Sequence, residues 1–212
     1  MSHVVFLYRN QRNMRYKKCV VVILKKFRLF VAVNFSDKTK NTIEALIKEL
    51  KIIPADAKWV SRKNLHITLK FLGDTPDEQI PAVITTLEQA AVGLAPLELK
   101  LGGFGVFPGQ NRPRVFWLGS AGETAMLAKL QAQVESGLEQ LGFKQERGRF
   151  TPHLTLARLR SPVNINEVLE KADRLYAKDS IVAKETISSF ELMSSVLSPK
   201  GPSYSVMASF RL

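Results

Sequence analysis

Two short segments of the chain share the pattern His-x-Thr-Leu, and they contain two of its three histidines. The segments are His66–Leu69 and His153–Leu156, which lie 87 positions apart in the numbering. Side chains alternate between the two faces of a strand, so His and Thr share one face and the apolar residues take the other. The repeat therefore predicts two half-buried strands, each presenting an imidazole and a hydroxyl to a site between them.

The pattern around these segments predicts strands mixed with helices. Apolar β-forming runs predict strands near 28–35, 65–72, 97–106, 114–118, 151–159, 187–197 and 204–211, with a short strand at Trp59-Val60. Apolar spacing predicts helices from an N-cap at Ser36 or Asp37 to about Leu50, and over about 76–92, 123–141 and 166–176. Gly102-Gly103-x-Gly105 lacks the Lys-Ser/Thr of a phosphate loop, and it predicts a bulge or turn.

Short turns between several of these strands argue against a purely parallel sheet. The fold class is therefore α+β with largely antiparallel sheets. Each motif strand is associated with helices of similar length, which indicates two related lobes that share a long interface.

The positive charge of the chain is concentrated at its start. Residues 1–28 hold eight of the 31 Lys and Arg residues and no acidic residue, which leaves 23 basic against 19 acidic residues in the remainder. We divide the chain into a basic arm, residues 1–26, and one domain, residues 27–212. The positive charge of the arm could attract a polyanion such as RNA. The plainer interpretation is a solvated tail, which is either disordered or lies upstream of the natural start of the protein.

The sequence indicates a protein of a reducing compartment. Cys19 is the only cysteine, so it cannot form an internal disulfide or a thiolate metal cluster. The apolar run 19–24 is followed at once by Lys25 and Lys26, and it is too short for a membrane span or a signal peptide. We expect a cytoplasmic monomer with no membrane partner.

Two histidines around one site suit a reaction that removes one proton and delivers another. Imidazole exchanges protons near neutral pH, and the threonine hydroxyls can hold anionic oxygens. In-line displacement at phosphorus needs a base and an acid on opposite sides of the phosphorus. No carboxylate cluster accompanies the histidines, so the sequence calls for no metal and no other cofactor.

The chain resembles a known family, the RNA 2′,3′-cyclic phosphodiesterases (2′-5′ RNA ligases) of the 2H phosphoesterase superfamily. The resemblance covers about residues 27–212 and rests on four stretches: Arg28-Leu-Phe-Val-Ala-Val33, Asn64-Leu-His-Ile-Thr-Leu-Lys-Phe-Leu-Gly73, Arg149-Phe-Thr-Pro-His-Leu-Thr-Leu-Ala-Arg158 and Gly201-Pro-Ser-Tyr204. Chains of this family usually begin near Met-Arg-Leu-Phe, whereas this one has Phe27 there and a basic arm before it.

The resemblance implies a bilobal fold whose two pseudo-symmetric lobes present the motifs to a central cleft. It also implies metal-independent hydrolysis of RNA 2′,3′-cyclic phosphate ends to 2′-phosphomonoesters, with 2′-5′ ligation as the reverse chemistry. On this hypothesis His153 deprotonates water, His66 protonates the departing 3′ oxygen, and Thr68 and Thr155 hold the phosphate. Arg158 is a further phosphate ligand by analogy, although strict strand alternation places it on the face opposite His153.

Other interpretations stay open. The same chemistry could act on a small cyclic nucleotide or a 2′-5′ oligonucleotide, and a non-catalytic RNA-binding module would use the histidines structurally. A metallohydrolase with both histidines as ligands would need acidic or cysteine partners that the motifs lack. Two further sets of residues could contact RNA but have a plainer interpretation as core or surface: the aromatic residues Phe104, Phe107 and Phe150, and the basic residues Arg112, Arg114, Arg147 and Arg149.

Overall fold

A computed structural model describes residues 2–9, 16–23, 25–146, 148–177, 180–199 and 201–212, with side chains from residue 25 onward. The strands are β1 (Ser2–Arg9), β2 (Tyr16–Ile23), β3 (Lys26–Asn34), β4 (Ala57–Trp59), β5 (His66–Pro76), β6 (Leu97–Phe107), β7 (Val115–Gly122), β8 (His153–Leu159), β9 (Ala183–Ile187), β10 (Ser189–Ser198) and β11 (Gly201–Arg211). The α-helices are α1 (Asp37–Leu50), α2 (Ile80–Ala91), α3 (Thr124–Gln140) and α4 (Ile165–Leu175), and the short 3-10 helices are η1 (Arg62–Asn64) and η2 (Asp77–Gln79).

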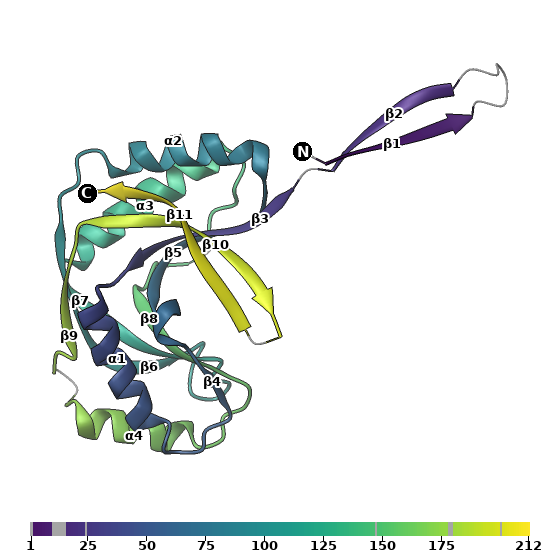
Figure 1. The fold of residues 1–212 in the computed structure, drawn as a ribbon. Coiled ribbons are helices and arrows are strands. Elements are labelled where there is room, and N and C mark those ends of the chain that lie inside the picture. The colour runs from purple at the N-terminus through teal and green to yellow at the C-terminus, as the bar shows by residue number, and fades with distance from the viewer. Residues whose placement is uncertain (1, 10–15, 24, 147, 178–179, 200) are drawn as a thin grey trace.

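The strands from β3 onward form one antiparallel sheet that divides into two halves (Figure 1). The first half has the order β11-β10-β3-β5, and the second has the order β8-β7-β6-β9 with β4 added on β8. The halves meet at β5 and β8, where Ile67 pairs with Leu154. These are the second residues of the two His-x-Thr-Leu segments, so the seam of the sheet brings the motifs together.

Each half of the sheet is covered by a pair of helices, and each pair combines helices from both halves of the chain. Helices α2 and α3 pack together against the first half, whereas α1 and α4 pack together against the second (Figure 1). Helix α1 follows β3 of the first half and α3 follows β7 of the second, so the two halves exchange a helix. This exchange makes the two lobes share one hydrophobic core.

The amphipathic pattern of the sequence explains how α1 begins and packs. Ser36 is the N-cap, and its Oγ accepts a hydrogen bond of 3.3 Å from the backbone N–H of Thr39. Ile43, Leu46 and Ile47 lie at helical spacing and are buried in the shared core. Burial of this one face fixes the direction in which the chain leaves β3.

The structure confirms the α+β class with antiparallel pairing, and it corrects two details. The prediction that the first motif strand ends near residue 72 was wrong, because residues 73–76 continue β5 by pairing with 26–29 of β3. The prediction also missed β9, which pairs with β6 as the edge strand of the second half. A register shift between Leu101 and Phe104 confirms the bulge predicted at the glycines.

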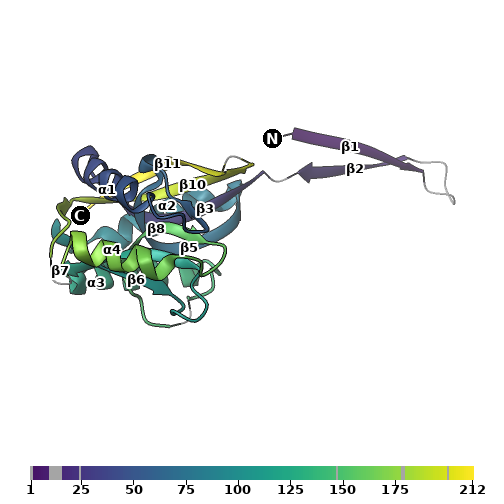
Figure 2. The same ribbon diagram turned by 90° about the horizontal axis from the view of Figure 1, so that it is seen from below.

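The N-terminal segment forms a separate two-stranded sheet, in which β1 pairs with β2 (Figure 2). The side chains of residues 1–24 lie outside the described residues, and the assignment of the arm, residues 1–26, as a unit distinct from 27–212 stays a prediction. Of the helices in the described part of the chain, none has the length and apolar character needed to cross a membrane.

Candidate active site

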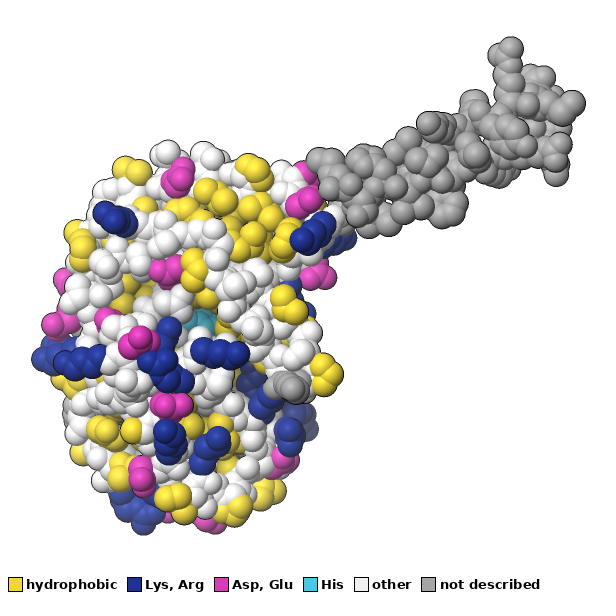
Figure 3. All heavy atoms as spheres, viewed as in Figure 1, with side chains coloured by type: hydrophobic (Ala, Val, Ile, Leu, Met, Phe, Trp, Pro, Cys, Tyr) yellow, Lys and Arg dark blue, Asp and Glu magenta, His cyan; other side chains and the backbone are white. Residues whose placement is uncertain are grey.

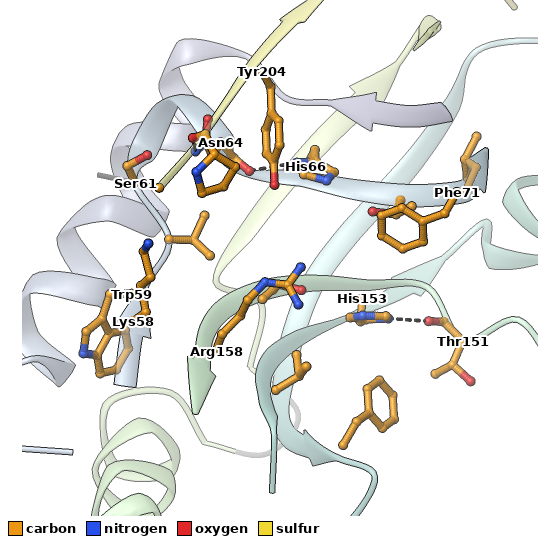
Figure 4. A pocket seen from close by; sticks show the side chains of 18 of the residues that line it. Lys58, Trp59, Ser61, Asn64, His66, Phe71, Thr151, His153, Arg158 and Tyr204 are labelled. Carbon is orange, nitrogen blue, oxygen red and sulfur yellow. Dashed lines mark hydrogen bonds between the residues drawn. The ribbon is translucent and has the colours of Figure 1, made fainter. Parts of the chain in front are cut away.

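A cavity of about 840 Å³ lies at the seam between the two halves of the sheet (Figure 4). All five residues singled out by the sequence line it: His66 and Thr68 from β5, and His153, Thr155 and Arg158 from β8. Figure 4 shows the two histidines on facing strands, with the guanidinium of Arg158 reaching into the space between them. The structure thus brings the predicted residues together, while their chemical roles stay predictions.

The pairing of β5 with β8 explains this arrangement. Because Ile67 pairs with Leu154 in antiparallel register, each histidine lies across from the threonine of the other motif. Ile67 and Leu154 are fully buried beneath the sheet, so the polar pairs face the opposite side. The two motifs therefore supply alternating imidazole and hydroxyl groups to one cavity.

Both histidines are held by the backbone in the same way. The Nδ1 atom of His66 lies 2.8 Å from the carbonyl oxygen of Asn64, and that of His153 lies 2.8 Å from the carbonyl oxygen of Thr151. A carbonyl can only accept, so each ring donates its Nδ1–H and its Nε2 is unprotonated in the neutral ring. Each Nε2 is thus the atom that can take up or give away a proton.

The environment of His66 favours its neutral form. Its ring packs 5.0 Å from the ring of Phe30 and 5.3 Å from that of Tyr204, measured between centroids. Burial is the main cause that lowers the pKa of His66 from 6.5 to about 4; the cations of Arg158 and Lys40 contribute to the lowering, and the Asn64 carbonyl opposes it. His66 is therefore uncharged at neutral pH in the free protein.

Arg158 enters the cavity because β8 contains a bulge. Phe116 of β7 pairs with Ala157, but the next residue, Trp117, pairs with Thr155, so Leu156 has no partner in the ladder. The extra residue reverses the alternation, which buries Ala157 and turns Arg158 to the face of His153. Arg158 therefore lies on the face of His153, although strict alternation of side chains along the strand would place it on the opposite face.

A family model described as the 2′-5′ RNA ligase superfamily matches residues 39–195. The chain belongs to this superfamily. The family resemblance deduced from the motifs is thereby confirmed.

Curated relatives in the 2′-5′ RNA ligase superfamily match over nearly their whole length. The RNA 2′,3′-cyclic phosphodiesterase of Methanothermobacter thermautotrophicus is 32% identical over 187 residues, which is 88% of this chain and 100% of the relative. The RNA 2′,3′-cyclic phosphodiesterase of Archaeoglobus fulgidus is 34% identical over 177 residues, covering 84% of this chain and 96% of the relative.

Solved structures show the same bilobal fold. A protein from Thermus thermophilus matches with a TM-score of 0.71 and 28% identity, over 87% of this chain and 97% of that one. LigT from E. coli, crystallised with 3′-AMP, matches with a TM-score of 0.72 and 22% identity, over 89% of this chain and 99% of that one. The LigT match concerns the fold alone, and both matches confirm the predicted architecture.

The cavity of this superfamily member is lined with positive charge. Four cationic side chains, those of Lys58, Lys63, Arg149 and Arg158, face it, against the single carboxylate of Glu146 among the described lining residues. Figure 3 shows a histidine in a hollow of the surface, beside Lys and Arg side chains. This balance suits an anionic ligand.

Several lining residues were not predicted as site residues. Tyr204 comes from β11, near the end of the chain, and packs against His66. Asn64 donates from Nδ2 to the carbonyl oxygen of Pro202 at 2.9 Å, which ties η1 to the tip of the hairpin formed by β10 and β11. The stretch Gly201-Pro-Ser-Tyr204 was a signal for these contacts, but it gave no indication of their partners.

The other candidate residues separate into two groups. Phe107 and Phe150 line the cavity, and the Phe107 ring lies 5.0 Å from that of His153, whereas Phe104 stacks on Phe116 in the core. Arg149 also lines the cavity, but Arg112 and Arg114 are exposed outside it. Arg147 lies outside the described residues.

Lys70 follows the first motif as Arg158 follows the second, but it does not face the cavity. Its side chain is fully buried, and its Nζ donates to Glu135 Oε2 at 2.5 Å and to the carbonyl oxygen of Lys144 at 2.8 Å. Phe71, the next residue, instead lines the cavity, and its backbone N–H donates to Glu146. Lys70 thus anchors the loop before β8 to β5.

Proposed function

We propose that this protein hydrolyses RNA 2′,3′-cyclic phosphate ends to 2′-phosphomonoesters, with 2′-5′ ligation as the reverse chemistry. The observation that carries the proposal is the pair of histidines that line one cavity, each with Nδ1 engaged by a backbone carbonyl. Curated relatives of 30–34% identity that are named RNA 2′,3′-cyclic phosphodiesterase support the choice of reaction. We expect RNA ends as the substrate and a cytoplasmic monomer as the working form.

The proposed reaction uses one histidine on each side of the phosphorus. The Nε2 of His153 takes a proton from water, and the water oxygen bonds to phosphorus. The bond between phosphorus and the 3′ oxygen breaks, and the Nε2 of His66 gives its proton to that oxygen, which leaves the phosphate on the 2′ oxygen. The hydroxyls of Thr68 and Thr155 and the guanidinium of Arg158 hold the nonbridging oxygens and balance their charge.

This order of events requires His66 to be protonated when the substrate is bound. A phosphate anion beside the ring favours the imidazolium, and it offsets the charge of Arg158 that lowers the pKa of His66 in the free protein. When a 2′-5′ linkage is cleaved, which is the reverse of ligation, the 3′ hydroxyl attacks phosphorus, His66 accepts its proton and the 5′ oxygen leaves. The neutral state favoured by burial suits that direction.

An oligonucleotide that ends in a 2′,3′-cyclic phosphate tests the proposal. Incubation in the presence of a chelator should give a 2′-phosphate product, because no step needs a metal ion. His66→Ala and His153→Ala should each lower kcat by about two to four orders of magnitude, as expected for loss of a general acid or base. A 3′-phosphate product, or a variant with full turnover, would contradict this mechanism.

A further inference from the structure

Two cations lie directly opposite one another at the edge of the cavity. Strand β4 pairs with β8 so that Lys58 is the register partner of Arg158, and both side chains line the cavity. Partners in an antiparallel pair point to the same face, with Cβ atoms about 5 Å apart. Figure 4 shows Lys58 on the side of Arg158 that is away from His153.

This arrangement is unfavourable in the absence of an anion. Like charges directly opposite each other on neighbouring strands destabilise a sheet. Neither Lys58 nor Arg158 forms an ion pair with an acidic residue in the part of the chain that the structure describes. A cavity edge lined by two adjacent cations, without a carboxylate between them, attracts anionic groups.

The Lys58 ammonium also lies beside Gly201, at the tip of the hairpin formed by β10 and β11. A Cβ placed on Gly201 would lie 3.0 Å from Lys58 Nζ and 3.3 Å from its Cε, so the absence of a side chain makes room for the lysine. The adjacent residues Pro202 and Ser203 line the cavity as well. The ammonium is therefore placed between β4 and the hairpin, on the side of Arg158 that is away from His153.

We propose that Lys58 and the hairpin tip at Gly201–Ser203 form a second phosphate subsite. This inference rests on the proposed function, in which the reacting phosphate lies between the histidines beside Arg158. That phosphate occupies the 2′ and 3′ oxygens of its nucleotide, so any further phosphate on the same nucleoside is attached at the 5′ oxygen. The subsite therefore recognises a 5′-linked phosphate, and it selects RNA ends over nucleosides that carry the cyclic phosphate alone.

Three substrates with the same base test the subsite: adenosine 2′,3′-cyclic phosphate, the same compound with a 5′-phosphate, and the dinucleotide that ends in adenosine 2′,3′-cyclic phosphate. We expect wild-type kcat/KM to be higher for the two substrates with a 5′-linked phosphate. Lys58→Met should lower that preference, measured as the ratio to the first substrate, about tenfold, which corresponds to the loss of one charged contact. Lys51→Met, which removes an exposed lysine that does not line the cavity, should keep the wild-type ratio.

Salt dependence gives a second measurement. Each phosphate contact to a single strand contributes about 0.7 to the slope of log affinity against log salt concentration, so Lys58→Met should reduce the slope for the dinucleotide by about that amount. Because the change relieves repulsion from Arg158, it should not lower the Tm.

The outcomes separate the possibilities. A gain for the dinucleotide supports a subsite that binds an internucleotide phosphodiester, whereas a gain only for the 5′-phosphate would refute the selection of RNA ends and assign the subsite to a terminal phosphate. The subsite is refuted if wild-type protein shows no preference among the three, or if Lys58→Met leaves the ratio unchanged. Failure of the wild-type protein to hydrolyse any of them would instead refute the proposed function.

Discussion

Acidification should unfold this protein partly through His66, and the size of the effect follows from its environment. Burial of the ring lowers the pKa of His66 from 6.5 to about 4 in the folded protein. In the unfolded chain the ring is solvated and keeps its ordinary pKa of about 6.5. Between these two values the unfolded chain binds a proton that the folded protein does not.

The sign and magnitude follow from proton linkage. Stability rises with pH wherever the unfolded state binds more protons, so the contribution of His66 is full above pH 6.5 and is lost as the pH falls toward 4. A difference of 2.5 pKa units between the values of 6.5 and about 4 corresponds to about 3 kcal/mol at 1.36 kcal/mol per unit. Below pH 4 both states are protonated, and this contribution changes no further.

Urea unfolding at pH 7 and pH 4 measures the effect. Carboxylates also titrate in this range, so the informative quantity is the difference between the wild type and His66→Gln, which keeps a polar side chain of similar length but does not titrate. The free energy of unfolding of the wild type should fall by about 3 kcal/mol more than that of His66→Gln. His153→Gln, the matched change in the second motif, should retain the contribution of His66. The prediction is refuted if wild type and His66→Gln lose the same free energy between these two pH values.

Other predictions concern the same site and its support. The acidic limb of the kcat/KM profile should fall near pH 4, because this profile reports the protonation of the free enzyme. The active form carries one proton on the His66–His153 pair, and the proton can move between the two rings without net uptake, so the position of the limb does not depend on which histidine is the base. Arg158→Met should lower kcat/KM on cyclic phosphate and move that limb to higher pH, since it removes a cation that lowers the pKa of His66; an unmoved limb would show that Arg158 does not act on His66. Lys70→Met should reduce the free energy of unfolding by about 3–5 kcal/mol, because it leaves Glu135 buried without its cation, and Lys70→Met combined with Glu135→Leu should recover most of this loss in urea unfolding. Equal destabilisation in the single and double variants would indicate that lost packing, not the unpaired charge, is responsible.

The local features of the fold could be predicted from the sequence, because they depend on residues close together in the chain. Apolar spacing located four helices, and the N-cap of the first, Ser36, was one of the two residues predicted for that position. The set of residues that line the cavity depends on contacts between residues far apart in the sequence. Pairing of Ile67 with Leu154 follows from the packing of both halves, and Tyr204 of β11 packs against His66 of β5 although β10 and β3 lie between these strands in the sheet. No local pattern encodes those contacts.

The bulges explain why the two cations after the motifs were harder to place. In β5, Val31 pairs with Lys70 and Ala32 with Thr68, so Leu69 is skipped just as Leu156 is skipped in β8. The residues after the bulges, Lys70 and Ala157, are therefore buried rather than aligned with the motif face. Regular alternation therefore predicts the wrong face of the sheet for the side chains beyond each bulge. A leucine within an apolar strand gives no sequence signal that a bulge occurs there.

The matching bulges also show how two similar lobes produce a site that is asymmetric from its β5 side to its β8 side. The residue five positions after each histidine turns into the cavity, and it is Phe71 in the first motif but Arg158 in the second. Phe71 is 58% exposed, so the β5 side of the cavity presents an aromatic surface while the β8 side presents a cation. Lys58 pairs with Arg158 and adds its charge to the β8 side. The backbone repeat thus supplies two imidazoles at equivalent positions, and the unequal residues beyond them determine which way round an anionic substrate can bind.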